Sequence, residues 1–390
     1  MNYTVSDFYQ TFKNGMKLIA GAGGMTRSIT SAGILDYEMD LVLKDKYIHS
    51  NFQENQLVIS SFLYAKDNPY LISDAVKHLV SKGTSGLVIK NVFHLPIHDS
   101  VLRYADSKNF PVFLIESQEI YVEKLIYEIS RRCEFTEDVR FSQNIINQIL
   151  TDDLTESEIA ACARKLNPSQ GEQFFTLYAE TDDSLSDFSF DLLHRRFLKS
   201  SLNMPGNTLV LHDRGFFYIH SEEGIAKKCT DSLITHILRT LLEDEPCTRC
   251  GVSQCHLTPD EFKISLLESL YAAAAKHRDK TEFTRYSQLG TLQFIFPFAE
   301  SREMQRYARS ILEPVADYDI ENNSSLLLTL QQYLQSDCEI SAAADTLSQH
   351  KNTIRYRLDK IHELTGLDYK NFSQLEQLSM ALKILQCSMP

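Results

Sequence analysis

Two blocks of the sequence alternate short apolar runs with amphipathic stretches, and this alternation restricts most of the chain to an α/β fold. In the first block, the apolar runs of strand length are residues 56–62, 85–91 and 111–117, and the stretches between them, 69–83 and 99–110, have helical spacing. Strands separated by helices pair in parallel as β-α-β units. We therefore expect a small open α/β domain at the N-terminus.

The second block lies between residues 172 and 298 and has a different order. Strand-like runs occur at 172–181, 247–253 and 291–298, and a hairpin is predicted over 208–220. Amphipathic helices are predicted at 187–202, 226–244 and 260–277. This order predicts a mixed α/β sheet of the ferredoxin-like or cyclase-like type.

The remaining segments are predicted to be helical. Residues 118–165 carry apolar faces at 122–129 and 141–150, and we expect them to connect domains or pair between subunits. From about residue 316 the chain reads as helix to its end. The whole is expected to be a multidomain protein, α/β plus all-α. Its predicted parts are an α/β effector domain, a helical connector, a non-catalytic cyclase-like domain and a helical C-terminal domain, over residues 1–117, 118–165, 166–315 and 316–390.

The C-terminal region holds a basic helix on an acidic chain. The formal net charge of the protein is -13. Residues 346–362 nevertheless contain four basic residues, Lys351, Arg355, Arg357 and Lys360, and a single acidic residue, Asp359. An acidic chain can still carry one small basic module, because salt limits the reach of distant charges to about 8–10 Å.

This basic helix is the second member of a predicted helix-turn-helix. A short helix over 339–350, a tight turn and the helix over 350–366 are braced by amphipathic helices on both sides. The 3.6-residue period places Ile354, Leu358 and Ile361 on one face, which we expect to be buried.

The opposite face and the N-terminal end of this helix carry an amide, a hydroxyl, a phenol and cations, the groups that read base edges and phosphates. We predict contacts to double-stranded DNA from His350, Lys351, Asn352, Thr353, Arg355, Tyr356, Arg357 and Lys360. The alternative is an ordinary solvent-exposed helix face.

The segment AAADTLSQHKNTIRYRLDKIHELTGLD resembles the C-terminal helix-turn-helix of PucR-type transcriptional regulators, the purine-catabolism and sugar-diacid group. The N-terminal segments TVSDFYQ, LIAGAGGMTRSITSAGILD and QLVISSFLYAKDNP resemble the N-terminal domain of that family, and the middle block resembles its degenerate cyclase-like domain. The resemblance implies an effector-responsive, oligomeric DNA-binding regulator of a catabolic pathway, with purine or related nitrogen metabolism as the first candidate. Because one helix-turn-helix covers a half-site, we expect a homodimer or higher homo-oligomer.

A small polar metabolite is the predicted effector. Ligands of open α/β sheets bind beyond the carboxyl ends of the parallel strands. In the first domain these ends carry Ser60, Ser61, Lys90, Asn91 and Glu116. The alternative is that these residues only cap strands and helices, or that Lys90 and Glu116 pair with each other.

Two clusters have residue types found at chemical sites. The glycines of GAGG at 21–24 lack the remaining residues of a phosphate loop, so a glycine turn is expected. Zinc-type ligands occur at Cys247, Cys250, Cys255 and His256, but these lie within ten residues and partly on a predicted strand, whose side chains alternate between faces. We predict no metal site and no cofactor.

Catalysis is not expected either. The hairpin lies where a diguanylate cyclase carries acidic residues, but its turn offers only Asp213, and Asp182 and Asp183 alone do not support two-metal chemistry. The alternative function is a nucleotide- or metabolite-sensing protein or enzyme built on the α/β domains, whose terminal helices serve assembly. A third possibility is an oligomeric scaffold. DNA retention by residues 316–390 alone would distinguish these from a regulator.

The chain is expected to act in the cytoplasm without a membrane partner. It has no run of about 18 apolar residues, and its N-terminus lacks a basic region followed by an apolar stretch. Its eight cysteines are irregularly spaced, which favours a reduced protein over a disulfide scaffold.

Overall fold

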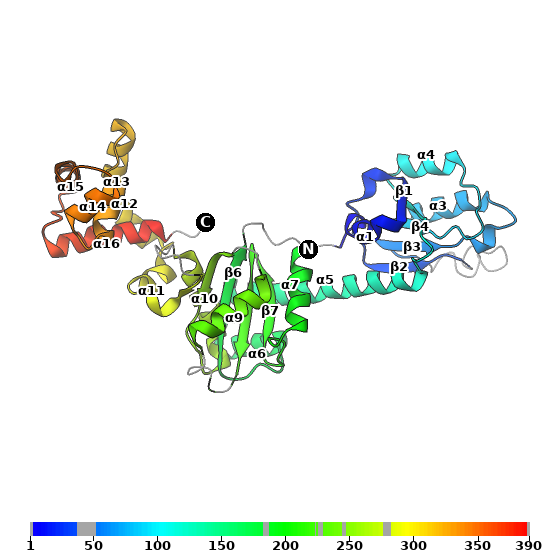
Figure 1. Ribbon diagram of the computed structural model, residues 1–390, viewed down its shortest axis with the longest axis horizontal. Helices are drawn as coiled ribbons and strands as arrows, with labels where there is room; N and C mark the ends of the chain where they lie inside the picture. Colours follow the sequence, from blue (N-terminus) through cyan, green and yellow to red (C-terminus); the bar gives the residue numbers. More distant parts are fainter. Residues whose placement is uncertain are drawn as a thin grey trace. The chain divides into compact units, whose positions relative to one another are not determined.

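A computed structural model describes residues 3–36, 52–181, 187–222, 224, 229–243, 247–275 and 282–387 (Figure 1). The chain forms two compact units, Met1–Asn144 and Ile145–Pro390. One continuous helix, α5 (Val122–Thr151), begins in the first unit and ends in the second. The sequence predicted two separate amphipathic stretches here. Leu125 and Ile129 are buried as expected, whereas Phe141, assigned to an apolar face, is exposed.

The first unit is built on a five-stranded sheet with the strand order β1-β5-β4-β3-β2. Neighbouring strands from β2 to β5 are parallel, and β1 is antiparallel to β5. The elements are α1 (Val5–Phe12), β1 (Met16–Ala20), β2 (Ser31–Ile34), β3 (Gln56–Ser60), α3 (Leu71–Ser81), β4 (Gly86–Ile89), α4 (Asp99–Ser107) and β5 (Val112–Ile115). The three predicted strands and the two helices between them are confirmed, and β1 and β2 extend the sheet beyond the prediction.

Both faces of this sheet are covered, which explains why its strands are apolar without alternation. Val58 and Leu87 enter a core with residues of α3 and α4. Their neighbours Leu57 and Val88 enter a second core, which includes residues of α1 and the start of α5. The sheet is therefore a central layer between helices.

The glycines of GAGG allow close backbone packing. A Cβ atom on Gly21 would lie 1.9 Å from the Phe110 carbonyl oxygen, and one on Gly24 would lie 2.0 Å from that of Asn109. Gly21 also has a φ of +74°, in the left-handed region that glycine adopts without strain. Its amide donates to Asp106 Oδ1 at 2.6 Å. These contacts explain why glycine is needed at these positions without a role in phosphate binding.

The second unit contains another five-stranded sheet, with the order β10-β9-β6-β8-β7. Strands β9 and β10 are parallel, and the other neighbours are antiparallel. Six consecutive elements follow the order β-α-β-β-α-β. The elements are α6 (Glu156–Leu166), β6 (Phe174–Thr181), α7 (Asp187–Lys199), β7 (Thr208–His212), β8 (Gly215–Ser221), α9 (Asp231–Leu242), β9 (Cys247–Val252), α10 (Phe262–Ala274) and β10 (Thr284–Arg285).

The strand predicted over residues 291–298 is wrong. This segment forms α11 (Leu292–Ile295) and a 3-10 turn over Phe296–Phe298. Ile295 and Phe296 are adjacent and both buried, a pattern that a strand with alternating faces does not give. Pro297 also lacks the N–H that a central strand needs.

Five helices complete the second unit: α12 (Arg302–Asn322), α13 (Leu326–Gln335), α14 (Ile340–Thr346), α15 (Lys351–Thr365) and α16 (Phe372–Gln386). The expected boundary at residue 316 lies inside α12. One continuous apolar core contains Leu312, Leu330 and Leu358 of these helices together with Tyr271 of α10 and Ile295 of α11. No helix in the described ranges is long and apolar enough to cross a membrane.

An aspartate fixes the junction between α12 and α13. Asp319, near the end of α12, accepts hydrogen bonds from the backbone N–H groups of Leu326 at 2.7 Å and Leu327 at 3.0 Å. Backbone N–H groups at the start of a helix lack intrahelical partners, so the Asp319 carboxylate of α12 caps the N-terminus of α13.

Candidate nucleic-acid interface

The helix-turn-helix consists of α14, a short turn and α15. Ser348 in the turn has a φ of +51°, a left-handed conformation that reverses the chain. His350 then caps α15, because its Nδ1 accepts a hydrogen bond from the Asn352 amide at 3.2 Å. At the other end, Gly366 has a φ of +73° and closes the helix in the way expected of glycine. The sequence thus defines both ends of α15.

The inner face of α15 is the predicted apolar stripe. Ile354 and Leu358 have no exposed surface, and Ile361 is 1% exposed. Ala343 and Ala344 of α14 are buried in the same core, where small side chains let the two helices approach closely. The predicted burial phase of α15 is confirmed.

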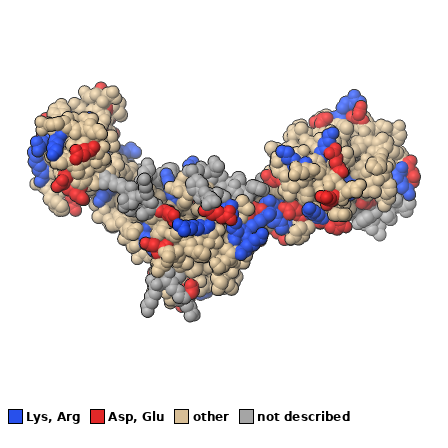
Figure 2. Space-filling model, viewed as in Figure 1, with Lys and Arg blue, Asp and Glu red and all other residues tan. Residues whose placement is uncertain are grey.

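The outer face of the first two turns is polar and accessible. The side chains of Lys351, Asn352, Arg355 and Tyr356 are exposed, and Tyr356 retains 65% of its surface. Figure 2 shows lysine and arginine side chains gathered on the surface over α15. Two cations, an amide and a phenol therefore share one solvent-facing surface, which we call the α15 outer face.

Two of the eight predicted DNA contacts approach side chains on other helices, and a third is half-buried. Arg357 is half-buried and its Nη1 donates to Thr329 Oγ1 of α13 at 3.1 Å. Lys360 pairs with Glu363 at 2.8 Å, and its ammonium lies 5.1 Å from the centre of the Tyr318 ring of α12. Thr353 is half-buried beside the apolar stripe. These contacts across neighbouring helices could not be seen in the helical period of α15.

Arg357→Ala is expected to lower the stability of the chain by about 1 kcal/mol, because it removes the hydrogen bond to Thr329 and the packing of the aliphatic stem. Chemical unfolding of the full chain measures this change. Thr329→Val removes the same hydrogen bond from the other side and serves as the matched variant. If Arg357→Ala weakens DNA binding without any loss of stability, the guanidinium acts on DNA and not as a brace.

The acidic side chain of the outer face is also held within the domain. Asp359 Oδ1 accepts a hydrogen bond from the Tyr369 hydroxyl at 3.1 Å and lies 3.9 Å from the Lys370 ammonium. Both partners follow α15 in the sequence. The negative charge is thereby partly balanced, which favours an anionic ligand on this side of α15.

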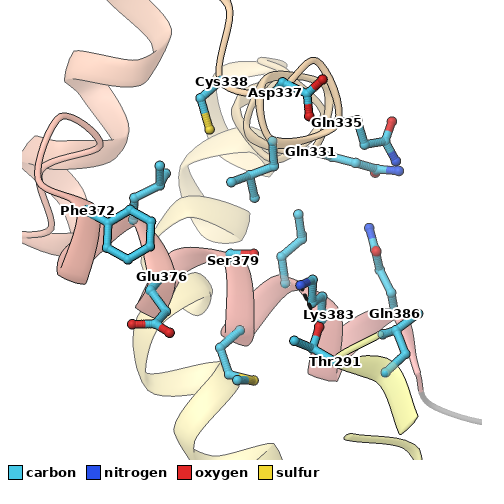
Figure 3. Close-up of a pocket in the computed structure, with 15 residues that line it drawn as sticks. Thr291, Gln331, Gln335, Asp337, Cys338, Phe372, Glu376, Ser379, Lys383 and Gln386 are labelled. Carbon is cyan, nitrogen blue, oxygen red and sulfur yellow. Dashed lines mark hydrogen bonds between the residues drawn. The ribbon is translucent and has the colours of Figure 1, made fainter. Parts of the chain in front are cut away.

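A groove of about 830 Å³ lies elsewhere on the helical region, between α11, α13 and α16. Figure 3 shows Phe372 and Glu376 on one side and Gln335 and Gln386 on the other, with Lys383 donating to Thr291 Oγ1 at 2.8 Å. None of its lining residues belongs to α15. The groove is therefore separate from the α15 outer face.

The residues predicted for the effector are divided by the structure of the first unit. Ser60, Ser61 and Lys90 line a cavity of about 220 Å³. Asn91 is used inside its own loop, where its side chain bonds the amide and the carbonyl of Leu95 at 2.8 and 2.9 Å. Glu116 is exposed and is not part of the lining.

Asp36 is a cavity residue that the sequence did not indicate. Its Oδ1 accepts hydrogen bonds at 3.0 Å from both the amide and the hydroxyl of Ser61. On the other side, the Lys90 ammonium donates to the Ile120 carbonyl oxygen and lies 5.4 Å from the centre of the Tyr121 ring. The cavity lining therefore contains the carboxylates of Asp36 and Glu123, an ammonium, hydroxyls and an aromatic ring.

The zinc-type residues of the second unit point to different partners. His256 lies between two glutamates, 3.1 Å from Glu268 and 3.4 Å from Glu261, and these carboxylates raise its pKa against the opposing effect of burial. Cys247 donates to the Arg249 carbonyl oxygen at 3.3 Å. Within the described residues, no group of three or more His, Cys, Asp or Glu side chains is arranged to hold a metal ion. Asp182 and Asp183 lie outside the described residues.

Comparison with known families gives two matches on separate parts of the chain. The PucR C-terminal helix-turn-helix domain matches residues 326–384. The purine catabolism regulatory protein-like family matches residues 9–132. The first match covers the helices from α13 to α16, and the second covers most of the first unit.

Several relatives match parts of the chain. The proline-responsive transcriptional activator PutR of Bacillus subtilis is 23% identical over 285 residues, which cover 70% of this chain and 68% of that protein. The purine catabolism regulatory protein of Bacillus subtilis is 37% identical over 82 residues, 21% of this chain and 15% of that protein. The carbohydrate diacid regulator of Escherichia coli is 36% identical over 78 residues, 20% of each.

A solved structure, the regulator of polyketide synthase expression from Bifidobacterium adolescentis, aligns with 63% of this chain and 97% of that chain at 19% identity. Its TM-score is 0.32.

Proposed function

We propose that the chain is a PucR-type transcriptional regulator, because family models of that group match residues 9–132 and 326–384. In this proposal it binds a DNA major groove with the first two turns of α15 and regulates a catabolic pathway in response to a small metabolite. The observation that carries this proposal is the α15 outer face, where Lys351, Asn352, Arg355 and Tyr356 are exposed opposite a buried stripe. In helix-turn-helix proteins the N-terminal residues of the second helix contact base edges. Cations there bind phosphates, and an amide suits adenine.

Genomic mapping of the DNA bound by the full-length protein tests this function. We expect discrete sites that share a sequence, and neighbouring genes would indicate the pathway and the effector. Fluorescence anisotropy with one such site and a scrambled duplex then measures the preference. Equal affinity for both duplexes, with no enriched genomic sites, would support the alternative in which the terminal helices serve only assembly.

The effector is proposed to bind in the cavity of the first unit. Carboxylates at Asp36 and Glu123 and an ammonium at Lys90 in the cavity lining suit a small molecule with both charges or with several donors and acceptors. The relatives are named for proline, purine catabolism and carbohydrate diacids, all of which involve small polar metabolites. The sheet supports this placement because Ser60 and Ile89 end neighbouring parallel strands at this edge.

A thermal-shift screen of amino acids, purine breakdown products and sugar diacids on the full chain identifies the effector. Lys90→Ala is expected to reduce the shift caused by the active compound, and Ser61→Ala to reduce it less, since Ser61 also holds Asp36. Lys77→Ala, an exposed lysine on α3, is the matched control and is expected to leave the shift unchanged. An active compound whose shift is the same in all four proteins would place its site outside this cavity.

The middle sheet is proposed to be a cyclase-like domain without catalysis. Its hairpin between β7 and β8 turns at Asp213 and Arg214, which leaves one carboxylate where two-metal chemistry needs several. We propose that this domain relays or supports regulation in the cytoplasm.

We propose that the protein binds DNA as a dimer or larger assembly. One α15 covers a half-site, and two copies would contact half-sites about 34–36 Å apart. Light scattering at micromolar concentration and footprinting on a mapped site are expected to show at least two copies and a two-part footprint. A monomer that protects a single short site would contradict this proposal.

A further inference from the structure

Two half-buried cysteines from distant parts of the second unit lie beside one arginine. Cys229 precedes Thr230, the residue that caps α9. Arg285 of β10 donates to the Cys229 sulfur at 3.4 Å through Nη1 and to the Cys229 carbonyl oxygen at 3.1 Å through Nη2. The same guanidinium pairs with Asp231 at 2.8 Å. The Arg285 guanidinium is therefore held next to the Cys229 sulfur by the Cys229 carbonyl oxygen and the Asp231 carboxylate.

Strand pairing brings the second cysteine to the same place. Arg285 is the register partner of Val252 in the parallel pair β9 and β10. The chain leaves β9 at this point and reaches Cys255, three residues after Val252. Cys255 and Cys229 are close enough for each to shift the pKa of the other, and both lie next to the Arg285 guanidinium.

This surrounding stabilises the thiolate form of Cys229. The hydrogen bond from Cys255 and the contacts with Arg285 lower the pKa of the Cys229 thiol, although burial and the nearby Asp231 act in the opposite direction. The start of α9 adds a favourable dipole for a negative charge. A thiolate held by a cation and a helix N-terminus is the reactive form of cysteine, and a neighbouring thiol can resolve its oxidised product.

We propose that Cys229 and Cys255 form a peroxide-reactive pair that closes into a disulfide. The Cys229 thiolate attacks one oxygen of hydrogen peroxide, breaks the O–O bond and becomes a sulfenic acid, while the hydroxide that leaves takes a proton to form water. The Cys255 sulfur then attacks the sulfenic sulfur, the S–O bond breaks, and a second water leaves with the Cys255 proton. The two thiols lose two electrons in total and the peroxide gains them.

Other cysteines of the chain provide internal comparisons. Cys338 is exposed, but burial of its sulfur and the nearby Asp337 raise its pKa, so it stays a thiol. The neighbouring Cys250 lowers the pKa of Cys247 as well, but no cation is among the groups that lower it, in contrast to Arg285 beside Cys229. If solvent access decided which cysteine is oxidised first, it would be Cys338. If thiolate stability decides, it is Cys229, so the first oxidised peptide distinguishes the two.

The experiment treats the reduced full-length protein with an equimolar amount of hydrogen peroxide, blocks the remaining thiols with an alkylating reagent and maps the peptides without reduction. We expect a peptide pair linked between Cys229 and Cys255 before any change at Cys338. Cys255→Ser is expected to leave the sulfenic acid on Cys229, where a cyclic 1,3-diketone traps it. Arg285→Lys is expected to slow the oxidation several-fold, and Cys338→Ser to leave its rate unchanged.

The order of oxidation in the unaltered protein is enough to contradict the proposal. The test therefore remains decisive even if a variant fails to fold. Oxidation at Cys338 or Cys247 before Cys229, or a Cys229 that oxidises without linking to Cys255, would each contradict it. So would an equal rate in the Arg285→Lys variant whose circular dichroism matches that of the unaltered chain.

Discussion

Lys351→Ala and Arg355→Ala, combined in one variant, are expected to weaken binding to every DNA sequence and to flatten its dependence on salt. Both side chains are exposed on the α15 outer face, where phosphate contacts release counterions on binding. Each lost contact reduces the slope of log affinity against log salt by about 0.9, so the double variant should lose roughly two. Anisotropy titrations at several salt concentrations, on a mapped site and on a scrambled duplex, measure both slopes.

Asn352→Ala separates base reading from phosphate binding on the same turn of helix. We expect it to cost about 1–3 kcal/mol at one base position and to leave the salt slope unchanged, because an amide pairs with a base edge and releases no counterion. The matched control is Gln349→Ala, an exposed amide in the turn before α15. If Asn352→Ala keeps both affinity and sequence preference, α15 does not enter the groove in the proposed way.

Leu358→Ala is expected to cost about 2–5 kcal/mol of stability, because it removes a fully buried side chain from a close-packed core. This core joins α12, α13, α14 and α15, so a cavity at Leu358 affects each of them. Denaturant unfolding of the full-length protein measures the loss. Leu328→Ala on α13 removes the same atoms from a side chain that is 52% exposed and is expected to cost much less.

Equal losses in Leu358→Ala and Leu328→Ala would mean that the two leucines are buried alike, against the described phase of α15. A loss confined to DNA binding, with no change in unfolding, would place Leu358 at the interface with DNA and not in the core.

The helical period was sufficient to predict the inner face of α15, because burial along one helix repeats every 3.6 residues. The same reasoning put Arg357 and Lys360 among the DNA contacts. It could not show that Thr329 and Tyr318, on two other helices, approach these cations. Periodicity identifies the helix face on which a side chain lies. The residues that this side chain contacts on other helices depend on how the helices cross.

The effector cavity shows the same limit. Ser60, Ser61 and Lys90 were predicted because they end apolar strands whose carboxyl ends share one edge. Asp36 follows β2, a four-residue strand with three small residues that shows no clear period. It reaches Ser61 because β2 pairs with β3. The strand predicted over 291–298 failed for a related reason, since Ile295 and Phe296 pack against helices that come later in the chain.

The core shared by α10, α11 and the five C-terminal helices limits how segments of this chain can be exchanged with those of similar proteins. A chimera joined at residue 316 would divide α12 and separate Leu312 from Leu330, its partner in that core. A junction just after α12 would remove Asp319 from the start of α13. Exchange of DNA specificity between relatives is therefore expected to succeed when α11 and α12 are transferred together with α15. It is also expected to succeed when only the exposed residues of α15 are replaced.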